Sequence, residues 1–185
     1  MCTDMNRAQL IELLADLAGP LGPFLEVHER EQARSAWLAE LDAKMLEMLL
    51  DILIHPPDPI EYRPATWDQF EMELADAVSA AGKQNPHQLL ESIGPLLDLA
   101  TPREVRPTII SLIGALGLRE GVQWLKPIVE NQQLTVDENL RLACSLGEIG
   151  GADARALLER MKQSPNAAND EVRREIEIAL EALSR

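Results

Sequence analysis

The sequence predicts an all-α fold built from stacked helical units, and three observations support this prediction. A pattern of apolar residues and glycines starts at Val105, Glu138 and Val172, at intervals of 33 and 34 residues (138 − 105 and 172 − 138). A fixed period of this length is typical of stacked supersecondary units. The apolar residues recur at helical rather than alternating spacing. Leu, Ala and Ile dominate a hydrophobic content of 46%, whereas aromatics make up only 3%, which favours helices over strands.

The central copy of the repeat, which starts at Glu138, shows the pattern most fully. Counted from that start, offsets 4, 7, 8, 9, 11 and 12 hold Leu142, Ser145, Leu146, Gly147, Ile149 and Gly150. The copy that starts at Val105 has, at the same offsets, Ile109, Leu112, Ile113, Gly114, Leu116 and Gly117. The copy that starts at Val172 has Ile176, Ala179, Leu180 and Leu183. The three segments are therefore predicted to be equivalent helices.

The Val105-Arg106 and Val172-Arg173 starts, with the Leu-Gly-Glu-Ile-Gly and Ile-Gly-Ala-Leu-Gly endings, resemble HEAT repeats. They are most similar to the short HEAT-like form of phycobilisome lyases and many bacterial scaffold proteins. The resemblance covers residues 86–185, and over residues 1–85 it rests on helix count alone. It implies an α-solenoid of antiparallel helix pairs, in which the helix that begins with Val-Arg is the inner one. The period is shorter than the roughly 40–47 residues of typical HEAT units.

The first half of the chain is expected to hold four helices. Thr3 or Asp4 can cap the first helix, which ends at the Gly-Pro segment 19–23. A second helix starts at about residue 26, and Asp42 can cap a third over residues 43–54, which is apolar almost all round and should be central. One continuous helix over residues 26–54 is the alternative, because a single apolar stripe runs through Asp42.

Prolines then interrupt the helical pattern over residues 55–64, which predicts an irregular segment. Thr66 or Asp68 opens the fourth helix, and Asn85 followed by Pro86 opens the fifth. Thr101-Pro102 repeats this signal for a sixth helix, and four more follow over residues 120–130, 136–149, 152–162 and 170–183. We expect a right-handed stack of about five helix pairs in a single domain, residues 1–185, with approximate repeats 4–41, 43–82, 86–117, 119–150 and 152–185.

Composition limits the partners and the compartment. The net charge of −14 and the pI near 4.6 disfavour a phosphate backbone and an anionic membrane as partners. Cys2 and Cys144 are too few for a disulfide framework, and the first thirty residues do not form a secretory leader. No apolar run reaches the roughly 18 residues of a membrane span. The sequence therefore predicts a reduced, cytoplasmic, soluble protein whose partner is another protein or a peptide.

The sequence shows no catalytic, cofactor or metal constellation. The three histidines, His28, His55 and His87, are dispersed, and none has a partner at metal-ligand spacing. The repeat glycines at positions 114, 117, 147 and 150 have no preceding strand and no Gly-Lys-Ser/Thr, so they do not form a phosphate loop. We interpret them as sites of tight helix ends and close helix approach, and we expect a protein without a cofactor that is not an enzyme.

Two features of the repeat have a structural and a functional interpretation. In resembling repeats the Arg of the Val-Arg start bonds to the acidic turn of a neighbouring unit, which implies that Arg106 and Arg173 pair with acids such as Asp137 and Asp170. For these arginines we favour a structural role, as a series of ion pairs that joins successive repeats, over a role in ligand binding. Cys144 is either a small buried residue, the usual state of a free cysteine, or a groove residue.

Stacked helix pairs generate an extended surface, so a scaffold that binds a peptide or protein in its groove is the expected function. If the Val-Arg helices are inner, the groove residues are Thr108, Ser111, Arg141, Cys144, Glu148, Arg174, Glu175 and Ile178. The resemblance to phycobilisome lyases implies an alternative, which is an accessory lyase or chaperone that handles a bilin chromophore or its carrier protein. A third class, the HEAT-like DNA glycosylases, needs a basic groove, and the net charge argues against it.

The proline segment carries a second, separate hypothesis. Tyr62 and Trp67 lie in or just after it, and long loops between short-linked repeats are often functional. Tyr62 and Trp67 could therefore form a contact at one rim of the solenoid. The alternative is that the aromatic residues pack in the core and the prolines stiffen the crossing.

Overall fold

The computed structural model describes residues 5–19, 27–83, 85–97, 105–130 and 134–184. Regular structure in these ranges is entirely helical, with ten α-helices and two 3₁₀ helices, so the all-α prediction is confirmed. No helix in these ranges is long and apolar enough to cross a lipid bilayer. The chain divides into two compact units, residues 1–84 and 85–185, and the boundary falls between the second and third expected repeats. The single domain stays a prediction.

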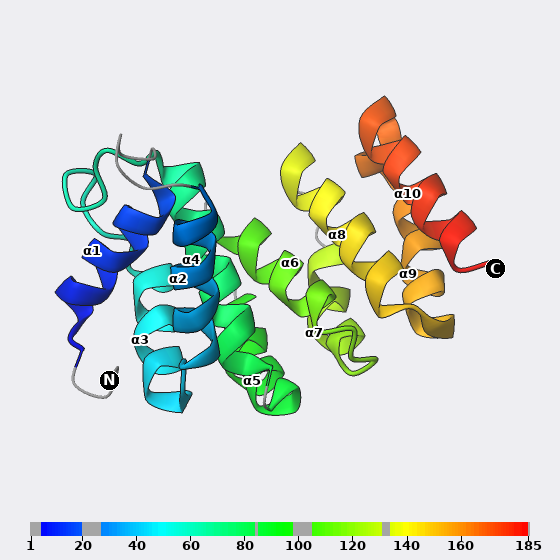
Figure 1. Cartoon of the computed structure of the whole chain (residues 1–185). Helices are drawn as coiled ribbons and strands as arrows, with labels where there is room; N and C mark the ends of the chain where they lie inside the picture. The colour runs from blue at the N-terminus through cyan, green and yellow to red at the C-terminus, as the bar shows by residue number, and fades with distance from the viewer. Residues whose placement is uncertain (1–4, 20–26, 84, 98–104, 131–133, 185) are drawn as a thin grey trace. The chain divides into compact units, whose positions relative to one another are not determined.

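The first unit contains four helices that pack around the last of them (Figure 1). They are α1 (Arg7–Ala18), α2 (Val27–Ala39), α3 (Ala43–Ile54) and α4 (Trp67–Gly82). The contacts of α4 extend to all three others, so α4 and not α3 is central, and the expectation for the third helix was wrong. On α3, Met48, Leu50 and Ile54 remain half-exposed. On α4, Ala77 and Ala81 are buried, and such small side chains let neighbouring helices approach closely.

Local caps set the boundaries of these helices. Asn6 caps α1 through the Gln9 amide at 3.0 Å, whereas the expected caps Thr3 and Asp4 lie outside the described residues. The Asp42 carboxylate accepts from the Met45 amide at 2.9 Å, and the backbone of Asp42 is extended. The break between α2 and α3 is therefore confirmed, and the alternative of one continuous helix is wrong. Thr66 caps α4, as one of the two predicted residues.

The second unit contains six α-helices and two 3₁₀ helices. They are α5 (Pro86–Ile93), η1 (Gly94–Leu97), α6 (Arg106–Ala115), α7 (Gly121–Val129), α8 (Val136–Ile149), α9 (Gly151–Gln163), η2 (Pro165–Ala168) and α10 (Asp170–Ala182). The helices of the repeated pattern, α6, α8 and α10, lie side by side in chain order (Figure 1). Helices α7 and α9 contact each other and both contact α8. The expected sixth-helix start, Thr101-Pro102, lies outside the described residues.

The contacts between α6, α8 and α10 repeat in register. A Cβ added at Gly114 would lie 2.5 Å from Ser145 Oγ, and one added at Gly147 would lie 3.1 Å from the Ala179 Cβ. Both contacts join offset 9 of one helix to offset 7 of the next. The Ser145 hydroxyl also donates to the Ile110 carbonyl at 2.9 Å. The predicted role of these two glycines in close helix approach is therefore confirmed.

A buried ion pair joins α6 to α8. The guanidinium of Arg106 donates to Glu138, and the two residues are 2% and 0% exposed. The other carboxylate oxygen of Glu138 accepts from the Thr135 amide at 2.7 Å, so one side chain caps α8 and neutralises Arg106. The partner of Arg106 is thus Glu138 and not Asp137, which lies 3.4 Å from Arg141 on its own helix.

The ladder of such pairs does not continue to α10. Arg173 lies 3.0 Å from Asp170 of its own helix and donates to the Ala167 carbonyl at 3.0 Å, so its expected bond to a neighbouring unit was wrong. The reason lies in the sequence of the repeats. The second copy has Asn139 at the offset of Arg106, and the third has Val172 at the offset of Glu138, so the two charges cannot recur at this contact.

Arg106 and Glu138 should be energetically coupled. We expect Arg106→Met to lower the free energy of unfolding by about 3–5 kcal/mol, because it leaves the Glu138 carboxylate buried without its counter-charge. In a Glu138→Gln background the same change should cost less, since that carboxylate is already absent. Urea unfolding followed by circular dichroism measures the four proteins of this cycle.

Arg141→Met is the matched control for this cycle, because it removes an arginine of α8 that is exposed. It should change the free energy of unfolding by less than about 0.5 kcal/mol. An equal cost of Arg106→Met in both backgrounds would contradict the coupling.

Candidate functional site

The eight residues predicted for the groove lie on one surface of the second unit. They come from α6 (Thr108, Ser111), α8 (Arg141, Cys144, Glu148) and α10 (Arg174, Glu175, Ile178). Each is exposed or half-buried, whereas core offsets such as Leu142 and Ile176 are fully buried. We call this surface the α6–α8–α10 face. The helical period explains it, because the predicted offsets lie across the helix from the apolar stripe.

Two contacts bring residues of this face together across neighbouring helices. Arg141 Nη1 donates to Ser111 Oγ at 3.5 Å, and Cys144 Sγ lies 3.1 Å from Glu175 Oε1. Both contacts join offset 6 of one helix to offset 3 of the next. The side chains therefore form a regular row and not a set of unrelated surface residues.

The chemistry of the face is mixed. Arg141 is held by Asp137 at 3.4 Å, so part of its charge is already neutralised. Ile178 is 50% exposed and offers an apolar contact on α10. Hydroxyls, carboxylates, guanidinium groups and one apolar side chain suit a peptide or a protein surface. The row does place a thiol, Cys144, beside a carboxylate, Glu175, and the protonation state of that thiol decides whether the contact could support nucleophilic chemistry.

Cys144 is exposed, so the default expectation that it is buried was wrong, and its position agrees with the alternative that it is a surface residue of α8. Partial burial, the hydrogen bond to Glu175 and the negative charges of Glu175 and Glu148 raise the pKa of the Cys144 thiol to about 11. The positive charge of Arg141 opposes this shift only in part. The thiol therefore stays protonated at neutral pH and donates to a carboxylate. This is the opposite of the low thiol pKa that a reactive cysteine needs.

The structure corrects the hypothesis that Tyr62 lies at an exposed rim. Tyr62 is 8% exposed, and its ring centroid lies 5.3 Å from that of Phe70 and 5.9 Å from that of Trp67. Trp67 is half-buried and stacks on Phe70 at 5.8 Å. These distances are typical of packed aromatic pairs. The loop residues with large exposed area are others, such as Ile60 at 72%.

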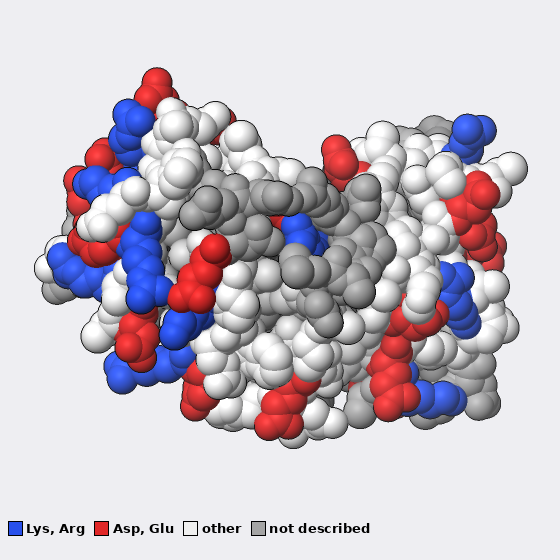
Figure 2. Space-filling model, turned by 180° about the vertical axis from the view of Figure 1, so that it is seen from behind, with Lys and Arg blue, Asp and Glu red and all other residues white. Residues whose placement is uncertain are grey.

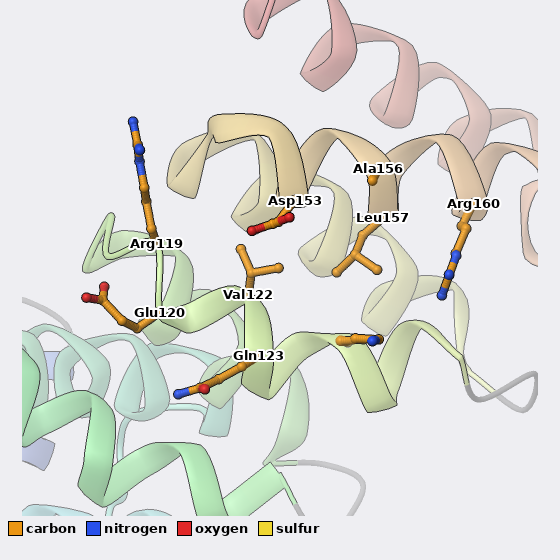
Figure 3. A pocket seen from close by; sticks show the side chains of 9 residues that line it. Arg119, Glu120, Val122, Gln123, Asp153, Ala156, Leu157 and Arg160 are labelled. Carbon is orange, nitrogen blue, oxygen red and sulfur yellow. The ribbon is translucent and has the colours of Figure 1, made fainter.

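A cleft between α7 and α9 was not predicted from the sequence (Figure 3). It has a volume of about 590 Å³ and is lined from α7 and the turn before it by Arg119, Glu120, Val122, Gln123 and Lys126, and from α9 by Asp153, Ala156, Leu157 and Arg160. A signal for it exists in the sequence. Residues 119, 122, 123 and 126 and residues 153, 156, 157 and 160 both follow the spacing i, i+3, i+4, i+7 that marks one helix face.

The surface also shows where basic side chains gather. In Figure 2, Lys and Arg side chains are concentrated on the side of the view that holds the C-terminal helices, and acidic side chains lie among them.

In the described part of the chain, no group of three or more His, Cys, Asp or Glu residues could hold a metal ion. Comparison of the chain with protein-family models, curated proteins and solved structures finds no match. The function is therefore inferred from the surfaces themselves.

Tyr62 is expected to contribute to stability. Tyr62→Ala should lower the free energy of unfolding by about 3 kcal/mol, because it removes a ring buried against Phe70 and Trp67. Ile60→Ala, in the same loop but exposed, is the control and should change stability by less than about 0.5 kcal/mol. Thermal and urea unfolding provide the measurement. If the Tyr62→Ala protein were as stable as the parent, the ring would not be part of the core, and the hypothesis of a surface contact at Tyr62 would stand.

The raised pKa of Cys144 predicts slow alkylation despite exposure. At pH 8 a thiol with a pKa of about 11 is ionised in about one molecule in a thousand, so iodoacetamide should react much more slowly than with a free cysteine. Glu175→Gln should speed the reaction, because it removes the negative charge that disfavours the thiolate. The rates are compared in a Cys2→Ser background by mass spectrometry, with Glu177→Gln as the control. Equal rates with and without Glu175→Gln would show that burial alone controls this thiol.

Proposed function

We propose that this chain is a short HEAT-like α-solenoid that acts as a non-catalytic scaffold and binds a peptide or protein on the α6–α8–α10 face. One observation supports the proposal above all others. Three helices that start with the same sequence pattern lie side by side, and equivalent offsets supply one continuous row of side chains. Repeat proteins use such rows as extended binding surfaces, because no single residue has to supply the affinity.

The chemistry of the row indicates the class of partner. An apolar side chain of the partner would cover Ile178, which is 50% exposed. Its polar groups would meet the guanidinium groups of Arg141 and Arg174 and the carboxylates of Glu148 and Glu175. This mixture, together with the net charge of −14, favours a protein or peptide over nucleic acid. A cytoplasmic location suits a face that presents the free thiol of Cys144.

Site-specific cross-linking tests this function. A photo-reactive amino acid placed at Ser111 or at Ile178 should cross-link the same protein in extracts of the source cell, because both positions belong to one face. The control position is Glu159, an exposed residue of α9 that does not belong to this face. Capture of the same protein from Glu159 would contradict the placement of the site.

Charge reversal then tests the face with the purified partner. Arg141→Glu combined with Arg174→Glu should weaken binding at least about tenfold, whereas the unfolding temperature should fall by no more than a few degrees. Arg155→Glu combined with Lys162→Glu changes the net charge equally from α9 and is the matched control. Equal weakening by both pairs would indicate a general charge effect. In parallel, a shift in the absorbance spectrum of a free bilin on addition of the protein would favour the bilin-handling alternative.

A further inference from the structure

The cleft between α7 and α9 uses residues outside the α6–α8–α10 face, and it is built from equivalent positions of two successive repeats. Arg119, Val122, Gln123 and Lys126 precede Asp153, Ala156, Leu157 and Arg160 by 34 residues each (153 − 119, 156 − 122, 157 − 123 and 160 − 126). Two helices thus present the same stripe to one cleft (Figure 3). A cleft of this kind can bind an extended or helical peptide segment along its length.

The charges along the cleft are unequal at its two ends. Asp153 lies toward the end of Arg119, and Arg160 lies at the other end (Figure 3). Lys126, on α7, also lines the cleft, and it occupies the position in its repeat that Arg160 occupies in the next (160 − 126 = 34). Arg160 contacts Glu130 at 2.6 Å, but Lys126 pairs with no carboxylate among the described residues. In a protein of net charge −14, this end of the cleft is a local positive site.

The floor of the cleft supplies a small apolar contact between the charged ends. Val122 and Leu157 form it and are 8% and 5% exposed, so they offer too little area to enclose a compact apolar ligand. Ala156 and Gln123 beside them are exposed. A ligand has to combine one modest apolar contact with ionic contacts, and the amide of Gln123 can bond a peptide group.

From this cleft we infer a second binding site, which takes an acidic peptide segment of a partner protein. Its carboxylates meet Lys126 and the guanidinium of Arg160, which already pairs with Glu130 but keeps 60% of its side chain exposed, and an apolar residue beside them packs on Val122, Ala156 and Leu157. Charge complementarity favours an acidic peptide over a basic one, and the two carboxylates of Glu120 and Asp153 disfavour a phosphate chain along the whole cleft. Because the ionic contacts are exposed, binding should weaken as salt rises.

Selection from a random twelve-residue peptide library on the immobilised full-length protein tests this site. Enriched peptides should contain Asp or Glu next to Leu, Ile or Phe. A synthetic fluorescent copy of one of them should bind more weakly at about 300 mM NaCl than at about 50 mM NaCl in an anisotropy titration. Lys126→Glu combined with Arg160→Glu should reduce its affinity at least about tenfold.

Two matched variants show whether the loss of affinity is specific to the cleft. Arg155→Glu combined with Lys162→Glu adds the same charge to the unit outside the cleft and should change the affinity less than about twofold. Arg141→Glu combined with Arg174→Glu, which tests the α6–α8–α10 face, should also leave this peptide bound. Circular dichroism melting confirms that each variant is folded.

Three results would overturn the inference. They are selected peptides with no excess of Asp and Glu, equal binding by the Lys126→Glu/Arg160→Glu protein, and loss of binding only in the Arg141→Glu/Arg174→Glu protein. The last result would assign the peptide to the α6–α8–α10 face and support the proposed function, so the two proposals fail separately.

Discussion

The close approach of α6, α8 and α10 is the constraint on which the second unit depends. Gly114 and Gly147 have no room for a Cβ without a shift of the next helix, because Ser145 and Ala179 already occupy that space. Core offsets then meet in a fixed register. The same register determines the outer surface, since it places Ser111 beside Arg141 and Cys144 beside Glu175. The candidate binding face is therefore a consequence of how the core packs.

Charge is used differently inside the unit and on its surface. Arg106 and Glu138 are buried, and the carboxylate of Glu138 also accepts from the Thr135 amide at the start of α8. The same side chain therefore helps to fix where α8 begins and how α8 packs on α6. Exposed pairs such as Arg160 with Glu130 contribute little to stability. They matter for recognition, because they decide which cations stay available. The α6–α8–α10 face carries charges of both signs and its Arg141 is paired with Asp137, whereas the cleft between α7 and α9 leaves Lys126 without a carboxylate among the described residues.

The first unit shows why an irregular segment need not be a binding site. The prolines of residues 55–64 prevent a helix there, but they do not decide which side chains turn inward. Tyr62 turns toward Phe70 and Trp67, and the loop is thereby anchored to α4. Aromatic rings are large apolar groups, so burial is their usual state when a core lies within reach.

The sequence by itself determined the helices and their breaks. Asp42, Thr66 and Thr135 each cap a helix through an amide three residues away, and such local signals can be read along the chain. The repeat also predicted which residues share the α6–α8–α10 face. Only the tertiary structure decided that Arg106 pairs with Glu138, that the Cys144 thiol contacts Glu175, and that α7 and α9 line a cleft. These contacts join residues about thirty positions apart, and their geometry depends on how helices pack and not on the local sequence.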